Sequence, residues 1–176
     1  MKKPTLATIW LDGCSGCHMS LLDIDERLIQ LAETFDILLS PLVDFKGFPE
    51  QVDFTLLEGA ISTDEDLEMV KRIRKATGTL IAFGDCAVSA NIPAMRNKFP
   101  LEQVFLRGYM ETTEGNTVIP DRLVPKLLDK AYPVHHFVHV DFFLQGCPPS
   151  ADLIFHTVTE LAQGRTPDIS HMARFG

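Results

Sequence analysis

The sequence lacks any apolar run near the roughly 20 residues that a bilayer-spanning helix needs, which excludes such a helix. It also lacks an export signal. Met1-Lys2-Lys3 is basic and leads into the apolar stretch Thr5–Leu11, but Asp12 cuts that stretch short, and neither a small-residue cleavage site nor an Arg-Arg pair follows. We therefore expect a protein that begins at Met1 and stays in the cytoplasm.

Positive charge is also scarce, because 16 Lys and Arg residues stand against 24 Asp and Glu residues, a formal net charge of −8. Nucleic acids and anionic membrane surfaces attract basic proteins, so neither is an expected partner. Internal repeats and low-complexity tracts are missing as well. A chain of 176 residues is long enough to bury its own core, and we expect a single domain over residues 1–176.

Cysteine occurs at four positions, Cys14, Cys17, Cys86 and Cys147. In a reducing cytoplasm an even number of cysteines does not imply disulfides. The four thiols indicate metal binding, redox chemistry or plain burial instead. Their positions relative to the expected secondary structure distinguish these possibilities.

Apolar, strand-like stretches alternate with helix-like stretches along most of the chain. This alternation is typical of an α/β fold, a doubly wound parallel sheet with helices on both faces. Prolines and glycines interrupt the pattern at about residues 91–130, where we expect a long irregular excursion with one short helix near Asp121–Leu128. The expected strands are Thr5–Leu11, Phe35–Ser40, Asp53–Glu58, Thr79–Phe83 and Phe137–Leu144, and the expected longer helices are Ser20–Ala32, Asp64–Ala76 and Ala151–Ala162.

Every cysteine follows an expected strand. Cys14 and Cys17 come after the first strand, Cys86 after the fourth and Cys147 after the fifth. The carboxyl ends of parallel strands meet at one edge of the sheet, where ligands bind in open α/β folds. The four thiols should therefore converge there, whereas cysteines that serve only as core residues would be scattered through the elements.

Four converging thiolates suit either an iron–sulfur cluster or zinc. Structural zinc usually takes two close pairs of ligands, and this sequence offers one close pair and two single cysteines. Glycines beside the cysteines leave backbone N–H groups free to bond inorganic sulfide, which favours a cluster. These glycines are Gly13, Gly16, Gly84 and Gly146.

The four segments resemble the small subunits of nickel–iron hydrogenases, and the resemblance extends from about Thr5 to Gly164. The short length and the missing export signal resemble the cytoplasmic, NAD-reducing type. Ser15 and Gly16 separate the first two cysteines, which are adjacent in a related subunit of respiratory NADH dehydrogenase. The segments are Trp10-Leu11-Asp12-Gly13-Cys14-Ser15-Gly16-Cys17, Glu58-Gly59-Ala60-Ile61, Gly84-Asp85-Cys86-Ala87 and Gly146-Cys147-Pro148-Pro149.

The resemblance implies a flavodoxin-like domain that holds one 4Fe-4S cluster and relays electrons. The partners would be a large subunit with the nickel–iron site and iron–sulfur or diaphorase subunits that reduce NAD. FMN is a further candidate cofactor, although cysteines occupy the first turn, where a flavin phosphate would bind. By motif match the ligands are Cys14, Cys17, Cys86 and Cys147, surrounded by Gly13, Ser15, Gly16, Gly84, Gly146 and Pro148.

Two further residues near the expected cluster are ambiguous. Glu58 ends the third strand, where it would relay protons, meet the large subunit, or simply bond loop amides. His18 follows Cys17, and we expect it to be a solvated residue at a helix start rather than a hydrogen-bonding partner near the cluster. Contacts with the large subunit are expected around Trp10–Met19, Glu58–Ser62 and Pro148–Pro149, with Ser15, Ala60 and Ile61 as test positions.

Two alternative functions remain open. A thioredoxin-like oxidoreductase would use Cys14 and Cys17 at a helix start, which lowers a thiol pKa, but it leaves Cys86 and Cys147 unexplained. A zinc-stabilised structural module would use the same four thiols without redox chemistry. Colour separates the three, since only an iron–sulfur protein is brown.

Overall fold

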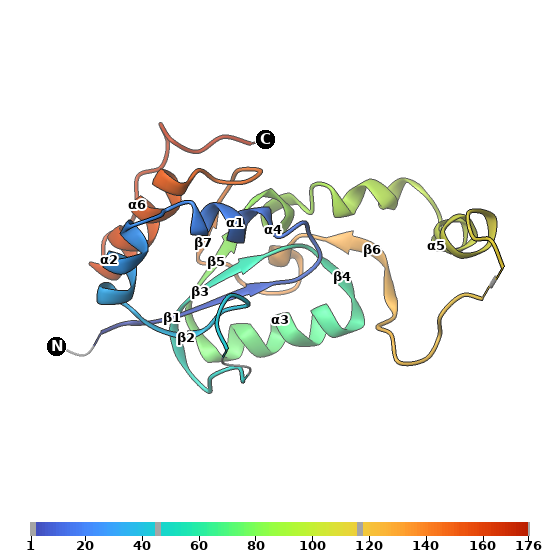
Figure 1. The fold of residues 1–176 in the computed structure, drawn as a ribbon, viewed down its shortest axis with the longest axis horizontal. Coiled ribbons are helices and arrows are strands. Elements are labelled where there is room, and N and C mark those ends of the chain that lie inside the picture. The colour runs from blue at the N-terminus through green and yellow to red at the C-terminus, as the bar shows by residue number, and fades with distance from the viewer. Residues whose placement is uncertain (1–2, 45–46, 116–117, 176) are drawn as a thin grey trace.

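The computed structural model describes residues 3–44, 47–115 and 118–175. Its centre is a five-stranded parallel sheet in the order β2-β1-β3-β5-β7 (Figure 1). Among the strands of this sheet the order is the flavodoxin-like 2-1-3-4-5, which confirms the expected doubly wound fold. The strands are β1 (Thr5–Trp10), β2 (Asp36–Leu39), β3 (Val52–Glu58), β5 (Thr77–Phe83) and β7 (Phe142–Leu144).

Helices cover both faces of the sheet because the central strands are apolar on both sides. On one face α1 (Gly16–Leu22), α2 (Arg27–Thr34) and α6 (Ala151–Ala162) enclose a core that includes Leu56. On the other face α3 (Asp64–Ala76) and α4 (Asp85–Ser89) enclose a second core that includes Leu57. Figure 1 shows α3 and α6 on opposite sides of the strands.

Two helices have the bounds that the sequence predicts, and both carry clear end signals. Thr63 and Asp66 form a capping box at the start of α3, whose first turn is acidic and whose last turn is basic. The side chain of Ser150 accepts the Leu153 N–H at the start of α6. Their predicted ranges are therefore confirmed.

Two other predictions need correction. The single helix expected over Ser20–Ala32 is divided into α1 and α2, and between them Asp25 takes a left-handed φ of 56°. The strand expected over Phe137–Leu144 is reduced to β7, and the 3-10 turn η3 (Val134–His136) precedes it. Asp141 explains the late start of β7, because its backbone N–H donates to Leu80 O and its side chain accepts the Leu80 N–H.

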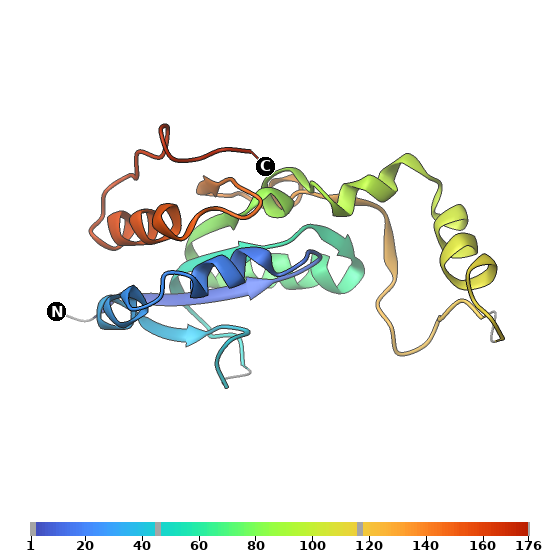
Figure 2. The same cartoon turned by 45° about the horizontal axis from the view of Figure 1, so that its top comes forward.

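The excursion expected at about residues 91–130 is present as an arm that projects from the sheet (Figures 1 and 2). The helix expected near Asp121–Leu128 is wrong, because β6 begins at Leu127 and pairs antiparallel with β4. Sequence reasoning also missed three short helical elements earlier in the arm, which are η1 (Pro93–Lys98), α5 (Leu101–Phe105) and η2 (Leu106–Glu111). The two paired strands are β4 (Ile61–Thr63), before the arm, and β6 (Leu127–Tyr132), at its end.

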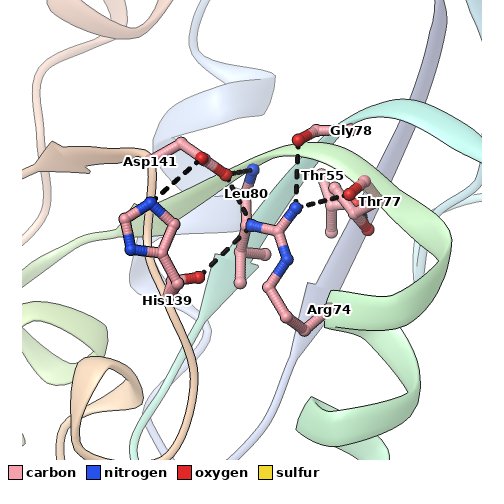
Figure 3. Close-up of polar contacts among 7 residues, drawn as sticks. All are labelled: Thr55, Arg74, Thr77, Gly78, Leu80, His139 and Asp141. Carbon is pink, nitrogen blue, oxygen red and sulfur yellow. Dashed lines mark hydrogen bonds and ion pairs between the residues drawn. The ribbon is translucent and has the colours of Figure 1, made fainter.

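A polar cluster joins β5 to the start of β7 at the amino edge of the sheet (Figure 3). The guanidinium of Arg74 donates to the carbonyl oxygens of Thr77, Gly78 and His139 and pairs with the carboxylate of Asp141. Asp141 also accepts the Leu80 N–H at 2.7 Å. The cluster satisfies strand-end backbone groups that otherwise would lack partners.

Within the described residues, no helix combines the length and the apolar character that crossing a membrane requires.

Candidate functional site

Three turns at the carboxyl edge of the sheet carry the four cysteines. Cys14 and Cys17 follow β1, with Cys17 already in α1; Cys86 lies in α4 after β5, and Cys147 follows β7. The turns touch one another: the Cβ that an alanine would place at Gly84 lies 2.1 Å from Cys17 Sγ, and the Cβ at Gly13 lies 4.0 Å from Cys86 Cβ. The structure therefore places the three cysteine turns next to one another at this edge, and metal binding by the four thiols stays a prediction.

The site is buried on one side and open on the other. Cys17 is buried and Cys86 is partly buried, whereas Cys14 and Cys147 are exposed, and none of the four forms a disulfide. A group held by these thiols would therefore contact the protein interior through Cys17 and the surroundings through Cys14 and Cys147.

The thiols interact strongly enough to change one another's proton affinity. Burial is the largest cause of the raised pKa of Cys17, followed by the charge of Glu58 and then by the other three cysteines. Burial also raises the pKa of Cys86 to about 11, although a hydrogen bond from the Ile92 backbone acts in the opposite direction. Four thiolates in this place would repel one another, and an iron–sulfur core or another metal would supply the positive charge that offsets the repulsion.

The thioredoxin-like alternative accounts for Cys14 and Cys17 only. Cys86 and Cys147 lie close enough to Cys17 to affect its pKa, and that alternative gives them no role. Among the described residues, no three His, Cys, Asp or Glu side chains surround one point as the ligands of a single metal ion would.

Two glycines allow the turns to approach so closely. Gly84 adopts a φ of +82°, and a side chain there would collide with the sulfur of Cys17. Gly146 adopts a φ of +138°, and a Cβ there would lie 2.6 Å from Pro149. Both positions require a backbone conformation and a clearance that only glycine provides.

Asp85 connects the Cys86 turn to the Cys147 turn, a role that sequence reasoning missed. Its buried carboxylate accepts the Gly146 N–H at 2.7 Å, and its own N–H donates to Gly146 O at 2.9 Å. A second tie runs from Ser20 Oγ in α1 to Pro149 O at 2.6 Å. The sequence did hold a signal for this role, because Asp85 is an acidic residue directly before Cys86 in an otherwise apolar segment.

Glu58 bonds loop amides, which is one of the roles considered for it. Its carboxylate accepts the backbone N–H groups of Cys17 at 3.3 Å and His18 at 3.0 Å. Only 3% of its side chain is exposed in the isolated chain, and the proton-relay and subunit-contact roles stay predictions. The prediction that His18 is solvated is wrong, because the residue is fully buried and its ring bonds Glu58.

The predicted contact surface also needs correction. Ala60 and Ile61 are 0% exposed and Ser62 is buried, so a charge there would disrupt the core rather than test docking. Trp10 is not a core residue, since it is 41% exposed beside the cysteine turns. The exposed residues of this edge are Trp10, Gly13, Cys14, Met19, Cys147 and Pro148.

Comparison with known proteins is consistent with the geometry. Residues 14–161 match the family described as NADH ubiquinone oxidoreductase, 20 Kd subunit. The delta subunit of the NAD-reducing hydrogenase HoxS of Cupriavidus necator is 38% identical over 172 residues, covering 95% of this chain and 82% of that protein. The iron-sulfur subunit of an F420-non-reducing hydrogenase from Archaeoglobus profundus is 30% identical over 92% of this chain, which spans 57% of its length.

A solved structure agrees over nearly the whole chain. One chain of an NAD+-reducing NiFe hydrogenase, crystallised in the H2-reduced state, superposes with a TM-score of 0.94 at 36% identity, covering 99% of this chain and 100% of that chain. The chain therefore belongs to the family that unites the 20 kDa subunit of NADH ubiquinone oxidoreductase with the small subunits of nickel–iron hydrogenases.

Proposed function

We propose that the chain is the electron-transfer small subunit of a cytoplasmic NAD-reducing nickel–iron hydrogenase, with one 4Fe-4S cluster on Cys14, Cys17, Cys86 and Cys147. The convergence of these four thiols from three separate turns is the observation that supports it most directly. The names of the similar proteins support the hydrogenase assignment, and one of them is described as an iron-sulfur subunit.

The bound cluster would supply a one-electron carrier, and the protein's own residues would fix its position and surroundings. Cys17 would provide a ligand from the buried side of the site. The missing side chain of Gly84 leaves the space that the Cys17 sulfur occupies. Asp85 keeps the Cys147 turn against the Cys86 turn. Because all four cysteines would be used, none is left to bind nickel, and the subunit would have to exchange electrons with other subunits.

The partners would be a large subunit with the nickel–iron site and a diaphorase module that reduces NAD. Electron transfer requires the large subunit to approach the cluster, so we place it over the cysteine edge, where Cys14 and Cys147 are exposed. Met19 and Trp10 add exposed apolar surface at the same edge, as expected at the centre of a stable subunit interface. FMN stays a prediction, because cysteines fill the turn after β1.

Iron and sulfide analysis of the anaerobically purified protein tests the cluster. We expect about four irons and about four sulfides per chain and a brown colour. Replacing Cys86 or Cys147 by Ala should remove or convert the cluster as completely as replacing Cys14. Ser89→Ala, a change at an exposed position of the same helix as Cys86, is the control and should keep the full iron content.

Other results would point to other functions. If Cys86→Ala keeps the iron content and the visible spectrum of the wild type, the four-ligand site is wrong. Stoichiometric zinc in a colourless protein would indicate a structural zinc module. A reducible Cys14–Cys17 disulfide without metal would indicate thiol chemistry.

The position of the large subunit can be tested with two matched variants. Met19, at the cysteine edge, is 56% exposed, and Ile29, in α2 away from that edge, is 65% exposed. Met19→Glu should block co-purification with the large subunit, because it places a charge in an apolar interface. Ile29→Glu should not. Normal assembly of the Met19→Glu protein would rule out docking over this edge.

A further inference from the structure

A chain of buried polar side chains extends from the cysteine turn across the sheet to the end of β2. Its members are Glu58 at the end of β3, His18 in α1, Thr8 in β1 and Ser40 after β2, and none is more than 5% exposed. Buried polar groups are costly unless they are fully paired. A histidine and a glutamate together in the core therefore require an explanation.

The four side chains pair with one another in sequence. The Nδ1 atom of the His18 ring shares a short hydrogen bond with the Glu58 carboxylate, and the Nε2 atom lies 3.0 Å from Thr8 Oγ1. Thr8 Oγ1 donates to Ser40 Oγ at 2.8 Å. Both ring nitrogens of His18 thus have a partner. Glu58 Oε2 bonds the ring and also accepts the His18 backbone N–H, while Oε1 accepts the Cys17 N–H.

Packing fixes the orientation of the His18 ring. Trp10 contacts it edge-on with centroids 5.2 Å apart, and Phe83 does so at 5.8 Å. The ring cannot turn away from Glu58 without displacing an aromatic neighbour. The carboxylate is therefore held against the amides of Cys17 and His18 by a rigid support.

The charge of Glu58 acts on the cysteine site. Its Oε1 atom accepts the backbone N–H of Cys17 at 3.3 Å, so the carboxylate lies directly beside a residue that would hold the cluster. A negative charge beside an iron–sulfur cluster disfavours the addition of an electron and so lowers the reduction potential. Hydrogen bonds that draw charge from the carboxylate weaken that effect.

We propose that His18 is a positioning residue that holds Glu58 on the amide of Cys17 and thereby sets the reduction potential of the cluster. The proposal rests on the proposed function, since it requires a cluster on the four cysteines. His18 does not touch the cluster ligands through its ring and acts through Glu58. Thr8 and Ser40 support the ring from its other side.

Midpoint potentials of single and double variants test whether His18 acts on the cluster through Glu58. His18→Leu leaves the carboxylate without its ring partner and should shift the potential to more negative values. Glu58→Gln removes the charge and should shift it to more positive values. In the Glu58→Gln background, His18→Leu should have little further effect, because the residue through which it acts is already neutral. His18→Gln, which keeps a donor group, should stay closer to the wild type than His18→Leu.

A matched pair of threonine variants separates this role from a merely structural one. Thr8→Val removes the hydroxyl that supports the His18 ring and should give a smaller negative shift. Thr55 carries a buried hydroxyl in β3 that bonds Thr77 at 2.8 Å, at the amino edge of the sheet (Figure 3). Thr55→Val should destabilise the fold to a similar extent and leave the potential unchanged.

The potentials are measured by EPR-monitored redox titration of the purified complex of small and large subunits, after iron and sulfide analysis shows a full cluster. Unchanged potentials in His18→Leu and Thr8→Val, with the cluster complete, overturn the proposal. If His18→Leu loses iron, a wild-type potential in Thr8→Val overturns it equally. A wild-type protein without iron and sulfide would sink the proposed function instead, a result distinguishable from either of these.

Discussion

At the scale of single residues, the cysteine site depends on clearances smaller than one methyl group. Gly84 shows this most clearly, because a Cβ at this position would lie 2.1 Å from the sulfur of Cys17 and the backbone takes a φ of +82°. Gly84→Ala should therefore separate the Cys17 and Cys86 turns. We expect lost iron and a free energy of unfolding lower by about 2–4 kcal/mol, measured by urea denaturation.

Gly108 provides the control for this prediction. A Cβ at Gly108 meets nothing within 4 Å. Gly108→Ala should keep the full iron content and leave the stability unchanged or slightly higher, since alanine favours the helical backbone there. If both alanine variants bind iron normally, the close approach at Gly84 is not required for the site.

Asp85 is the second residue whose replacement should affect the site without touching a sulfur. Asp85→Ala leaves the Gly146 N–H without its acceptor in a buried place, which should cost about 1–3 kcal/mol of stability. Asp85→Asn keeps an acceptor and should cost less. Hydrogen exchange at residues 146–150 is the local measurement. Equal exchange in the wild type and Asp85→Ala would contradict the role as a tie between the turns.

The four cysteines and the glycines beside them could be named as candidate site residues from the sequence, because the motifs that contain them are short and local. The roles of His18 and Asp85 were not predicted, since both depend on partners 40 or more residues away in the chain. Ala60 and Ile61 were misplaced for a related reason, because their burial depends on distant partners. Ala60 pairs with Asp12, and Ile61 pairs with Tyr132 of β6.

At the scale of elements, helices with capping residues were predicted well. α3 and α6 have the expected bounds because their ends are specified locally by Thr63, Asp66 and Ser150. The break between α1 and α2 was missed because apolar residues continue through it. β6 was missed because it pairs with β4, a contact between segments more than 60 residues apart.

The polar cluster between β5 and β7 leads to a pH prediction. Burial alone would raise the pKa of Asp141, but the Leu80 N–H and the Arg74 guanidinium outweigh it and hold the pKa below its ordinary value. A carboxyl with a lowered folded-state pKa adds stability above its unfolded pKa of about 3.9, and this contribution is lost as the pH falls below that value.

Asp141→Asn should therefore destabilise the protein at neutral pH, by about 1 kcal/mol, and the difference from the wild type should shrink as the pH approaches 3. Urea denaturation at a series of pH values measures it. Asp36→Asn, at an exposed position in the edge strand β2, is a control for the loss of one negative charge. A difference that stays constant down to pH 3 would contradict the assigned role of the Asp141 charge.

At the scale of the whole molecule, the arm is the part least supported by the sheet. Arg96 and Asn97 tie its base to β6, but the side chains beyond them are largely exposed, including that of Arg107. Limited digestion of the isolated subunit with trypsin should cut first after Arg107 and Arg122, and the sheet fragments should stay associated. Mass spectrometry of early time points would identify the cuts. Initial cleavage within α3 would contradict this.

The sequence predicts the overall topology of the sheet more completely than it predicts the structure of the arm. Alternating strands and helices, with right-handed crossovers, leave few possible arrangements, so the doubly wound sheet and the edge that carries the cysteines followed from the sequence. No such rule predicts the arm, because α5 and η2 pack mainly on each other and η1 packs on β6 rather than on the sheet. Its shape is known only from the structure.

The spacing of the cysteine turns along the chain has a consequence for biosynthesis. Cys14 and Cys17 leave the ribosome early, but their partner turn at Cys147 follows only after β7, which closes the far side of the sheet. A nascent polypeptide therefore exposes an incomplete set of thiols until Cys147 has been made. The three turns can meet only once β7 has joined the sheet, so cluster insertion would be coupled to completion of the fold.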